Sequence, residues 1–277
     1  MSGRAPAPRA PDATLPYHST LNMRTLLKAL VALCALACVA AAQTRKAPPY
    51  GLPAGALVVE ERPLELGGAK KRALVLWMLR PKKYPRGPDE GYTCPEKTRG
   101  SFYRGPARVS LVDADARRVV NTLRVVQEYS HGEDEFDLPF RIKAGGYYHV
   151  EGTPEGREGR PTVMRLRDFN GDGEALEFAL YDALACMGLE TALFGYSVRR
   201  DRVIQYPVSL ETVGGGKRVT QVLNWVDYLF GKEPAAPGRW KFAVDYRGRG
   251  GSLDSYEVRY NSQAERFEGV VTYTTEQ

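Results

Sequence analysis

Short apolar segments with a period of two residues recur along this 277-residue chain. Each is rich in Val, Leu or aromatic residues, and Pro, Gly and charged residues separate it from the next. This alternation is typical of strands with two different faces, and the spacing favours antiparallel sheets. The chain is therefore predicted to be mainly β, as a sandwich or an irregular barrel. The expected strands are 56–61, 72–79, 107–112, 119–126, 138–143, 146–151, 191–198, 202–210, 240–246, 256–260 and 267–273.

One segment near the C-terminus has a different period. Apolar residues recur at helical spacing, polar residues stand opposite them, and Gly231 and Pro234 follow. The pattern predicts one amphipathic helix over 217–230 that covers a sheet. The run Gly214-Gly215-Gly216-Lys217 is interpreted as a linker into this helix, and the Pro-rich stretch 80–105 as a long loop. The apolar positions of the helix are Val219, Val222, Leu223, Val226, Leu229 and Phe230.

An acidic loop lies between two further alternating segments, 164–167 and 176–181. Oxygen-bearing side chains recur at alternate positions of this loop, at Asp168, Asn170 and Asp172. Gly171 and Gly173 adopt positive φ readily, so the backbone can curl around one point. This pattern favours a hard cation, and calcium is the expected ion.

The loop begins like an EF-hand, but Ala179 stands at the twelfth position, where that motif needs a bidentate Glu. Its residues resemble instead the calcium loop of the FG-GAP (integrin-propeller-like) repeat family, whose core reads Asp-x-Asn-Gly-Asp-Gly followed by an acid. The resemblance covers 168–177 only, and it implies calcium and a partial propeller-like architecture. The ligands that it implies are Asp168, Asn170, Asp172, the backbone carbonyl of Glu174, and Glu177, which stands one residue later than the family's acid.

A plain hairpin turn is the alternative interpretation of this loop. Its acids would then be solvated, or paired with Arg165 and Arg167. Four acidic side chains on one short loop repel one another in the absence of a cation. The calcium interpretation is therefore preferred, and the plain turn stays open.

The N-terminal 42 residues are predicted to be a leader. Arg24 and Lys28 precede a short apolar stretch at 29–39, and Ala40-Ala41-Ala42 supplies the small residues that signal peptidase requires. Cleavage is expected before Gln43, and translation begins at Met1 or Met23. The segment 43–277 is then one secreted or periplasmic β domain, with a subdivision near 155–160 as the alternative. A second alternative is a lipid anchor at Cys38.

Charge argues against nucleic acid as a partner. The whole chain carries a formal net charge of +6, but the leader holds four of the basic residues and one acid, so the remainder is only about +3. Its short basic clusters lack the interleaved aromatics of a nucleic-acid groove. The apolar stretch of the leader is too short for an ordinary membrane span, so no transmembrane helix is expected to be retained.

Two cysteines, Cys94 and Cys186, remain after cleavage. In an exported chain a lone pair is most simply a disulfide, and the alternative is a buried free thiol at Cys186. Only His131 and His149 remain as histidines, and neither belongs to a recognised catalytic motif.

The preferred hypothesis is a non-catalytic, calcium-stabilised module that binds a surface protein or a glycan. The alternative is a secreted hydrolase that uses paired carboxylates, as glycosidases do.

The leader generates a direct test. Protein recovered from a secreting host is expected to begin at Gln43, because the small residues before it fit signal peptidase. Intact-mass analysis checks this start. A mature chain that still carries 23–42 would contradict the export hypothesis, and a diacylated Cys38 would support the lipoprotein alternative.

Overall fold

The structure is a computed structural model. It describes residues 48–68, 70–84, 102–126, 136–138, 140–141, 149–150, 163–184, 188–214 and 217–275. All of them belong to one compact unit, residues 47–277. The described chain is mainly β, as predicted, and its helical segments are three short 3₁₀ turns, Pro49–Gly51, Leu229–Gly231 and Arg247–Arg249. Within these ranges no helix is long and apolar enough to cross a membrane.

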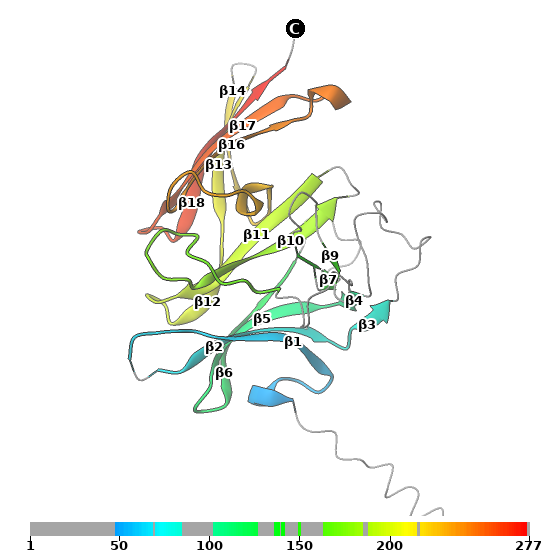
Figure 1. The fold of residues 1–277 in the computed structure, drawn as a ribbon, viewed down its shortest axis with the longest axis vertical. Helices are drawn as coiled ribbons and strands as arrows, with labels where there is room; N and C mark the ends of the chain where they lie inside the picture. The colour runs from blue at the N-terminus through cyan, green and yellow to red at the C-terminus, as the bar shows by residue number, and fades with distance from the viewer. Residues whose placement is uncertain are drawn as a thin grey trace, which may run out of the picture. The chain divides into compact units, whose positions relative to one another are not determined.

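Three main sheets build the fold (Figure 1). The first sheet has the order β1-β2-β5-β6, from Ala56–Pro63, Arg72–Leu79, Ala107–Asp113 and Arg118–Arg124. The middle sheet is β10-β11-β12, from Glu177–Leu184, Gly188–Ser197 and Arg202–Tyr206, with β15 (Val226–Asp227) also paired to β11. The last sheet is β14-β13-β18-β17-β16, from Lys217–Leu223, Val208–Gly214, Arg266–Thr274, Leu253–Asn261 and Arg239–Asp245.

Two small sheets complete the described strands. One has the order β3-β4-β7, from Lys82–Tyr84, Phe102–Gly105 and Phe136–Leu138, and the other pairs β8 (Phe140–Arg141) with β9 (His149–Val150). Most strand pairs are antiparallel, as expected, and β16, β17 and β18 form an antiparallel meander from the predicted strands 240–246, 256–260 and 267–273. The exception is β13, which pairs in parallel with β18. In the described part of the chain every sheet is open, which favours the sandwich over the barrel.

The middle sheet is buried on both faces. Phe178, Leu180 and Phe194 lie in the core that it forms with the first sheet. Their neighbours Ala179 and Leu193 lie in a second core shared with the last sheet. Side chains of adjacent residues point to opposite faces of a strand, so a doubly covered strand must be apolar almost throughout. Any charged group on such a strand therefore needs special accommodation.

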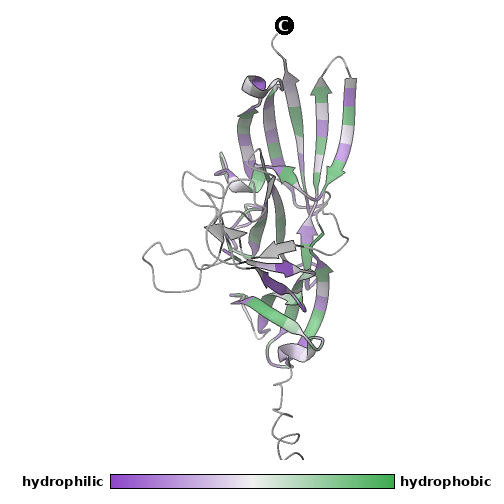
Figure 2. Cartoon of the chain, turned by 90° about the vertical axis from the view of Figure 1, so that its right-hand side faces the viewer, coloured by the Kyte–Doolittle hydropathy of each residue, from purple (hydrophilic) through white to green (hydrophobic). Residues whose placement is uncertain are grey.

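In the last sheet, unlike the middle sheet, polar and apolar residues alternate along the strands. Figure 2 shows polar and apolar residues in turn along the strands of the last sheet. In β17, Asp254, Tyr256 and Val258 are buried, while Ser255 and Glu257 are exposed. This sheet therefore has one face on the core and one face in solvent.

The predicted amphipathic helix over 217–230 is wrong. The segment forms β14, a turn, β15 and a 3₁₀ turn, and β14 pairs with β13 at the edge of the last sheet. Val219 and Val222, two of its expected core positions, are 51% and 63% exposed. Valine has a branched side chain that favours strands, so the helical spacing of these residues did not exclude a strand. The glycine run is consequently not a linker into a helix, since Gly214 and Lys217 face each other across the β13–β14 hairpin.

Two other boundaries differ from prediction. The expected strand 202–210 is two strands that join different sheets, β12 and β13, with Pro207 between them. Proline has no backbone N–H for a ladder, so it suits a point where the chain leaves one sheet. The stretch 80–105, predicted to be a loop, contains β3 and β4.

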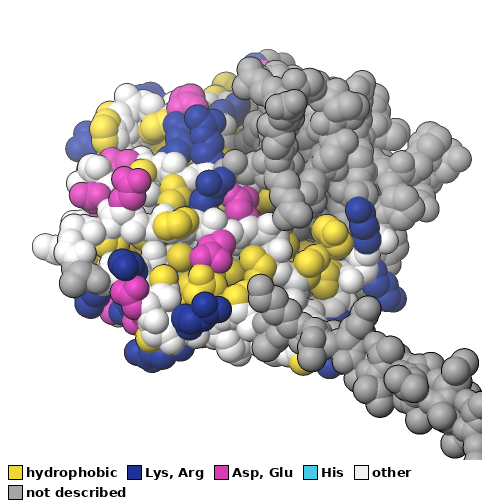
Figure 3. Space-filling model, turned by 60° about the horizontal axis from the view of Figure 1, so that its bottom comes forward, with side chains coloured by type: hydrophobic (Ala, Val, Ile, Leu, Met, Phe, Trp, Pro, Cys, Tyr) yellow, Lys and Arg dark blue, Asp and Glu magenta, His cyan; other side chains and the backbone are white. Residues whose placement is uncertain are grey.

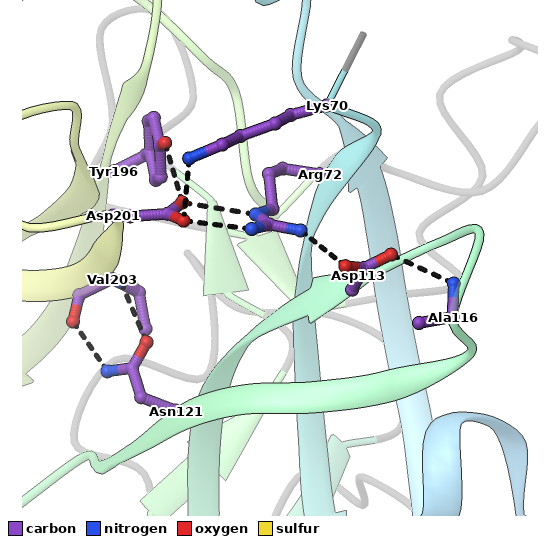
Figure 4. A network of polar contacts seen from close by, with 8 residues as sticks. All are labelled: Lys70, Arg72, Asp113, Ala116, Asn121, Tyr196, Asp201 and Val203. Atoms are coloured by element: carbon purple, nitrogen blue, oxygen red, sulfur yellow. Dashed lines mark hydrogen bonds and ion pairs between the residues drawn. The ribbon is translucent and has the colours of Figure 1, made fainter.

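Polar contacts fasten the first sheet to the middle sheet (Figure 4). The Arg72 guanidinium donates two hydrogen bonds to Asp201, at 3.1 and 2.8 Å, and one to Asp113 at 2.7 Å. The hydrogen bonds from Arg72 hold the pKa of Asp201 well below its usual range. Close by, the Asn121 amide donates to the Val203 carbonyl at 2.9 Å and accepts from the Val203 N–H at 3.0 Å. Asn121 thus pairs with a strand of the other sheet as a backbone would.

Replacing Arg72 by Lys is expected to lower the free energy of unfolding by about 2 kcal/mol. A single ammonium cannot serve both carboxylates in the fork geometry that the guanidinium provides. Urea unfolding measures the change. Lys71→Gln is the control, because the Lys71–Asp115 pair is exposed and should contribute less than about 0.5 kcal/mol. Equal effects of the two variants would contradict this role of Arg72.

Candidate functional site

The acidic loop is closed at its base by one antiparallel bridge. The Arg167 N–H donates to the Glu177 carbonyl at 2.8 Å, and the Glu177 N–H donates to the Arg167 carbonyl at 3.3 Å. Only the downstream flank is a strand, β10, so the strand expected at 164–167 is reduced to this bridge. The loop therefore projects from the start of a strand in the middle sheet.

Asp168 folds the loop by accepting backbone hydrogen bonds. One of its oxygens accepts from the N–H groups of Gly171, at 2.6 Å, and Asp172, at 3.1 Å. The other accepts from the Gly173 N–H at 3.0 Å. Gly171 and Gly173 have φ values of 80° and 94°, as the sequence pattern predicts. The carboxylate thus organises a curled backbone whose N–H groups point at it.

Asn170 joins two other carboxylates at the centre of the loop. Its Nδ2 donates to Asp172 Oδ2 at 2.9 Å and to Glu177 Oε1 at 3.0 Å. Its Oδ1 accepts from the Asp172 N–H at 2.8 Å. These two carboxylate oxygens share one donor, so each lies about 3 Å from the same nitrogen. Two oxygen ligands of one calcium ion at about 2.4 Å lie no more than about 5 Å apart, so a bound ion would hold them within that distance. The amide N–H₂ stands where positive charge would be favourable.

Glu177 is a fully buried carboxylate, with 0% of the residue exposed. It accepts hydrogen bonds from the Phe169 N–H at 3.1 Å and the Tyr206 hydroxyl at 3.5 Å, in addition to Asn170. Burial above all, together with the charges of Asp172 and Asp168, raises its pKa to about 8 against the lowering effect of the hydrogen bond from the Phe169 N–H. Among the described residues, no Lys or Arg forms an ion pair with Glu177.

The arginines beside the loop do not neutralise its acids. Arg167 forms an ion pair with Glu233 at 2.7 Å, outside the loop. Arg165 is exposed, and in the described ranges it pairs with none of the loop carboxylates. The form of the plain-turn alternative in which both arginines pair with the loop acids is therefore not what the structure has.

Glu174 lies apart from the other predicted ligands. The residue is exposed, its N–H donates to Asp172 Oδ1 at 2.9 Å, and its carbonyl accepts from the Leu176 N–H at 3.1 Å. The structure therefore brings Asn170, Asp172 and Glu177 together around one point. Asp168 lies beneath them as the organiser of the backbone.

Sequence reasoning missed the residues that surround the loop. Gly195 faces Glu177 across the β10–β11 pair, and a Cβ there would lie 2.7 Å from Glu177 Cγ and 2.8 Å from the Leu176 carbonyl. Gly238 has φ +66°, and a Cβ there would lie 2.5 Å from the Asn170 carbonyl oxygen. In the sequence, these two contacts are indicated only by the fact that both residues are glycine. That the two glycines lie beside the loop is visible only in the folded structure.

An aromatic cluster holds the loop through the side chain of Phe169. Phe169 is 4% exposed, and its ring stacks on Trp240 and meets Phe230 edge-on, with centroids 6.3 and 6.1 Å apart. The Arg167 guanidinium also lies over the Phe169 ring, 5.5 Å from its centroid. Loop conformation is thus tied to packing between the middle and last sheets.

Several predicted residues lie outside the described ranges. They are Cys38, Cys94, Cys186, His131 and the leader, so the disulfide and the leader stay predictions. His149 lies in β9.

Figure 3 shows Lys and Arg interspersed with Asp and Glu on the described part of the face that it displays.

Comparison with protein-family models, with curated proteins and with solved structures finds no match to this chain. In the described ranges no group of three or more His, Cys, Asp or Glu side chains is arranged to hold a metal ion. What the loop brings together is two carboxylates and one amide.

Gly195→Ala is expected to destabilise the fold by about 1–3 kcal/mol, because the added methyl overlaps Glu177 and the backbone of Leu176. Urea unfolding at pH 6 measures the effect. Gly67→Ala is the matched control, since nothing lies within 4 Å of a Cβ at that position. A wild-type stability for Gly195→Ala would show that Glu177 is not held against this strand.

Proposed function

We propose that this protein is an exported β-rich module with a non-catalytic binding or structural role, stabilised by calcium in the loop 168–177. The observation that carries the proposal is Glu177, a fully buried carboxylate without a basic partner among the described residues. Burying a carboxylate is costly unless a proton, a cation or a basic side chain neutralises it. The neighbouring carboxylate of Asp172 increases this cost and favours a divalent ion.

Calcium fits the donor set better than a transition metal. Carboxylates, an amide oxygen and backbone carbonyls are hard ligands, and calcium accepts irregular arrangements of them. Asp172 and Glu177 would hold the ion, with Asp168 as a further acid. Asn170 would join them after its amide turned over, so that Oδ1 in place of Nδ2 faced the two carboxylates. Bound calcium would supply the charge that the carboxylates lack. The resemblance of the loop to the FG-GAP calcium loop supports the same assignment.

A hydrolase role for this site is less well supported. Glu177 has the raised pKa that a general acid needs. Its side chain is, however, fully buried beneath the loop, so a substrate could not reach it. A structural role follows, in which the ion would join the loop to the sheets that pack around Phe169.

Export and partners belong to the same proposal. The leader pattern supports export of the mature domain to a compartment where free calcium would be abundant enough for a site of modest affinity. A surface protein or a glycan is the proposed partner. The disulfide Cys94–Cys186 would suit that compartment, and a lipid anchor at Cys38 is the alternative to release.

Stability should depend on pH and calcium together. In chelator, the folded pKa of Glu177 (about 8) lies above its unfolded value. Its contribution to stability is then fully present below about pH 4.5 and is lost as pH rises towards 8. Calcium binds the ionised carboxylate, so the rise in melting temperature with millimolar calcium should be larger at pH 8 than at pH 5. Differential scanning calorimetry in calcium and in chelator measures both effects.

Two variants separate the roles of the acids. Glu177→Gln should reduce both the pH dependence in chelator and the calcium response, because it removes the buried titrating group. Glu174→Gln is the matched control and should keep both, since that acid is exposed in the same loop. Identical melting of the wild type in calcium and in chelator at pH 8 would leave the plain turn as the explanation.

A further inference from the structure

Two arginines stand directly opposite each other on the solvent face of the last sheet. Arg239 of β16 pairs in register with Arg259 of β17, and both residues are exposed. Like charges placed opposite each other on neighbouring strands destabilise a sheet. Such an arrangement suggests a role other than stability.

Neighbouring charges on this face are paired, but these two are not. Lys241 forms an ion pair with Glu257 at 2.5 Å, and Arg266 pairs with Glu268 at 2.7 Å. Arg259 faces Glu268 across the β17–β18 pair, and its charge helps to lower the pKa of that carboxyl, after the hydrogen bonds from Asn261 and Arg266. Within the described ranges, neither Arg239 nor Arg259 has a side-chain hydrogen bond or an ion pair.

Both arginines line two adjoining hollows in the surface. One hollow, of about 350 Å³, is bordered by Asn170 of the acidic loop, the Pro237–Gly238 turn and the hairpin residues that follow Tyr260. The other, of about 610 Å³, lies over Trp240 and Gly269 and is also lined by Glu257 and Glu268, whose charges are paired with Lys241 and Arg266. Because both hollows share Arg239 and Arg259, a ligand in either of them meets two guanidinium groups.

We infer that Arg239 and Arg259 form a site for the carboxylate or sulfate group of an acidic polysaccharide. Guanidinium forks bind such oxyanions through paired hydrogen bonds. Ser262 and Gln263, at the rim of the smaller hollow, are exposed and present a hydroxyl and an amide that suit sugar hydroxyl groups.

An extended acidic peptide suits this place less well. Peptides that bind sheets gain most from main-chain hydrogen bonds at a free edge. Arg259 belongs to β17, between β16 and β18, and Arg239 belongs to β16, which is the edge strand. The Arg239 N–H and carbonyl already bond to the backbone of Ala235 and Ala236, so the edge is occupied beside the pair. A ligand here must bind through its own polar groups, as a polysaccharide does.

The inference deepens the binding role proposed above but does not depend on calcium. Its test is therefore carried out in chelator, where calcium cannot bridge protein and polymer. Affinity electrophoresis of the full chain would compare gels that contain polygalacturonate, dextran sulfate or neutral dextran, with a polyglutamate gel to represent an acidic peptide. Retardation by either anionic polymer, with none by neutral dextran, is expected, and the two polymers distinguish carboxylate from sulfate.

Variants assign the retardation to the arginine pair. Arg239→Gln combined with Arg259→Gln should weaken binding at least tenfold. Arg202→Gln combined with Arg218→Gln removes the same charge from exposed positions elsewhere and should change binding less than twofold. Circular dichroism confirms that both double variants are folded.

Three outcomes would overturn the inference. They are the absence of retardation by both anionic polymers, equal weakening in the two double variants, and retardation by polyglutamate alone. Failure of this test would leave the calcium response of the melting temperature untouched, because the two experiments measure different groups.

Discussion

Burial of the middle sheet on both faces is the constraint on which the rest of the structure depends. One core joins it to the first sheet and a second core joins it to the last sheet. A strand in this position has no solvated face, so each polar side chain on it must find a partner inside the protein. Glu177, at the start of β10, is the residue for which this requirement is most severe.

The surroundings of Glu177 are arranged to meet that requirement. Gly195 leaves room for its side chain, and Phe169, Asn170 and Tyr206 direct hydrogen bonds at its oxygens. These donors are neutral, so they lower the cost of burial without removing the charge. A proton or a cation can supply the remaining neutralisation, and the nearby Asp172 makes a divalent ion more effective.

Local patterns predicted much of this fold. The bounds of β2 match the expected strand 72–79. Its apolar run has polar residues at both ends, so the ends of the strand could be located from the sequence. The acidic loop, its glycines and its approach to Glu177 also follow from residues close in sequence. The helix over 217–230 failed because β14 is an edge strand with exposed valines, whose spacing fits either structure.

Long-range contacts could not be predicted in this way. Gly195, Tyr206 and Gly238 surround the loop but lie 18 or more residues beyond Glu177 in the sequence. Pro207 is compatible with a break between two strands, but its neighbours in the sequence do not reveal that the two strands join different sheets. The parallel pairing of β13 with β18 likewise depends on how distant segments share a core.

Calorimetric titration of calcium at pH 7 in two buffers of different ionisation enthalpy tests the central claim most directly. The pKa of Glu177 lies near 8, so binding should release roughly one proton, and the measured heat should differ between the buffers. Glu177→Gln should release none. Absence of binding, or binding without proton release that survives in Glu177→Gln, would contradict a cation held by this buried carboxylate.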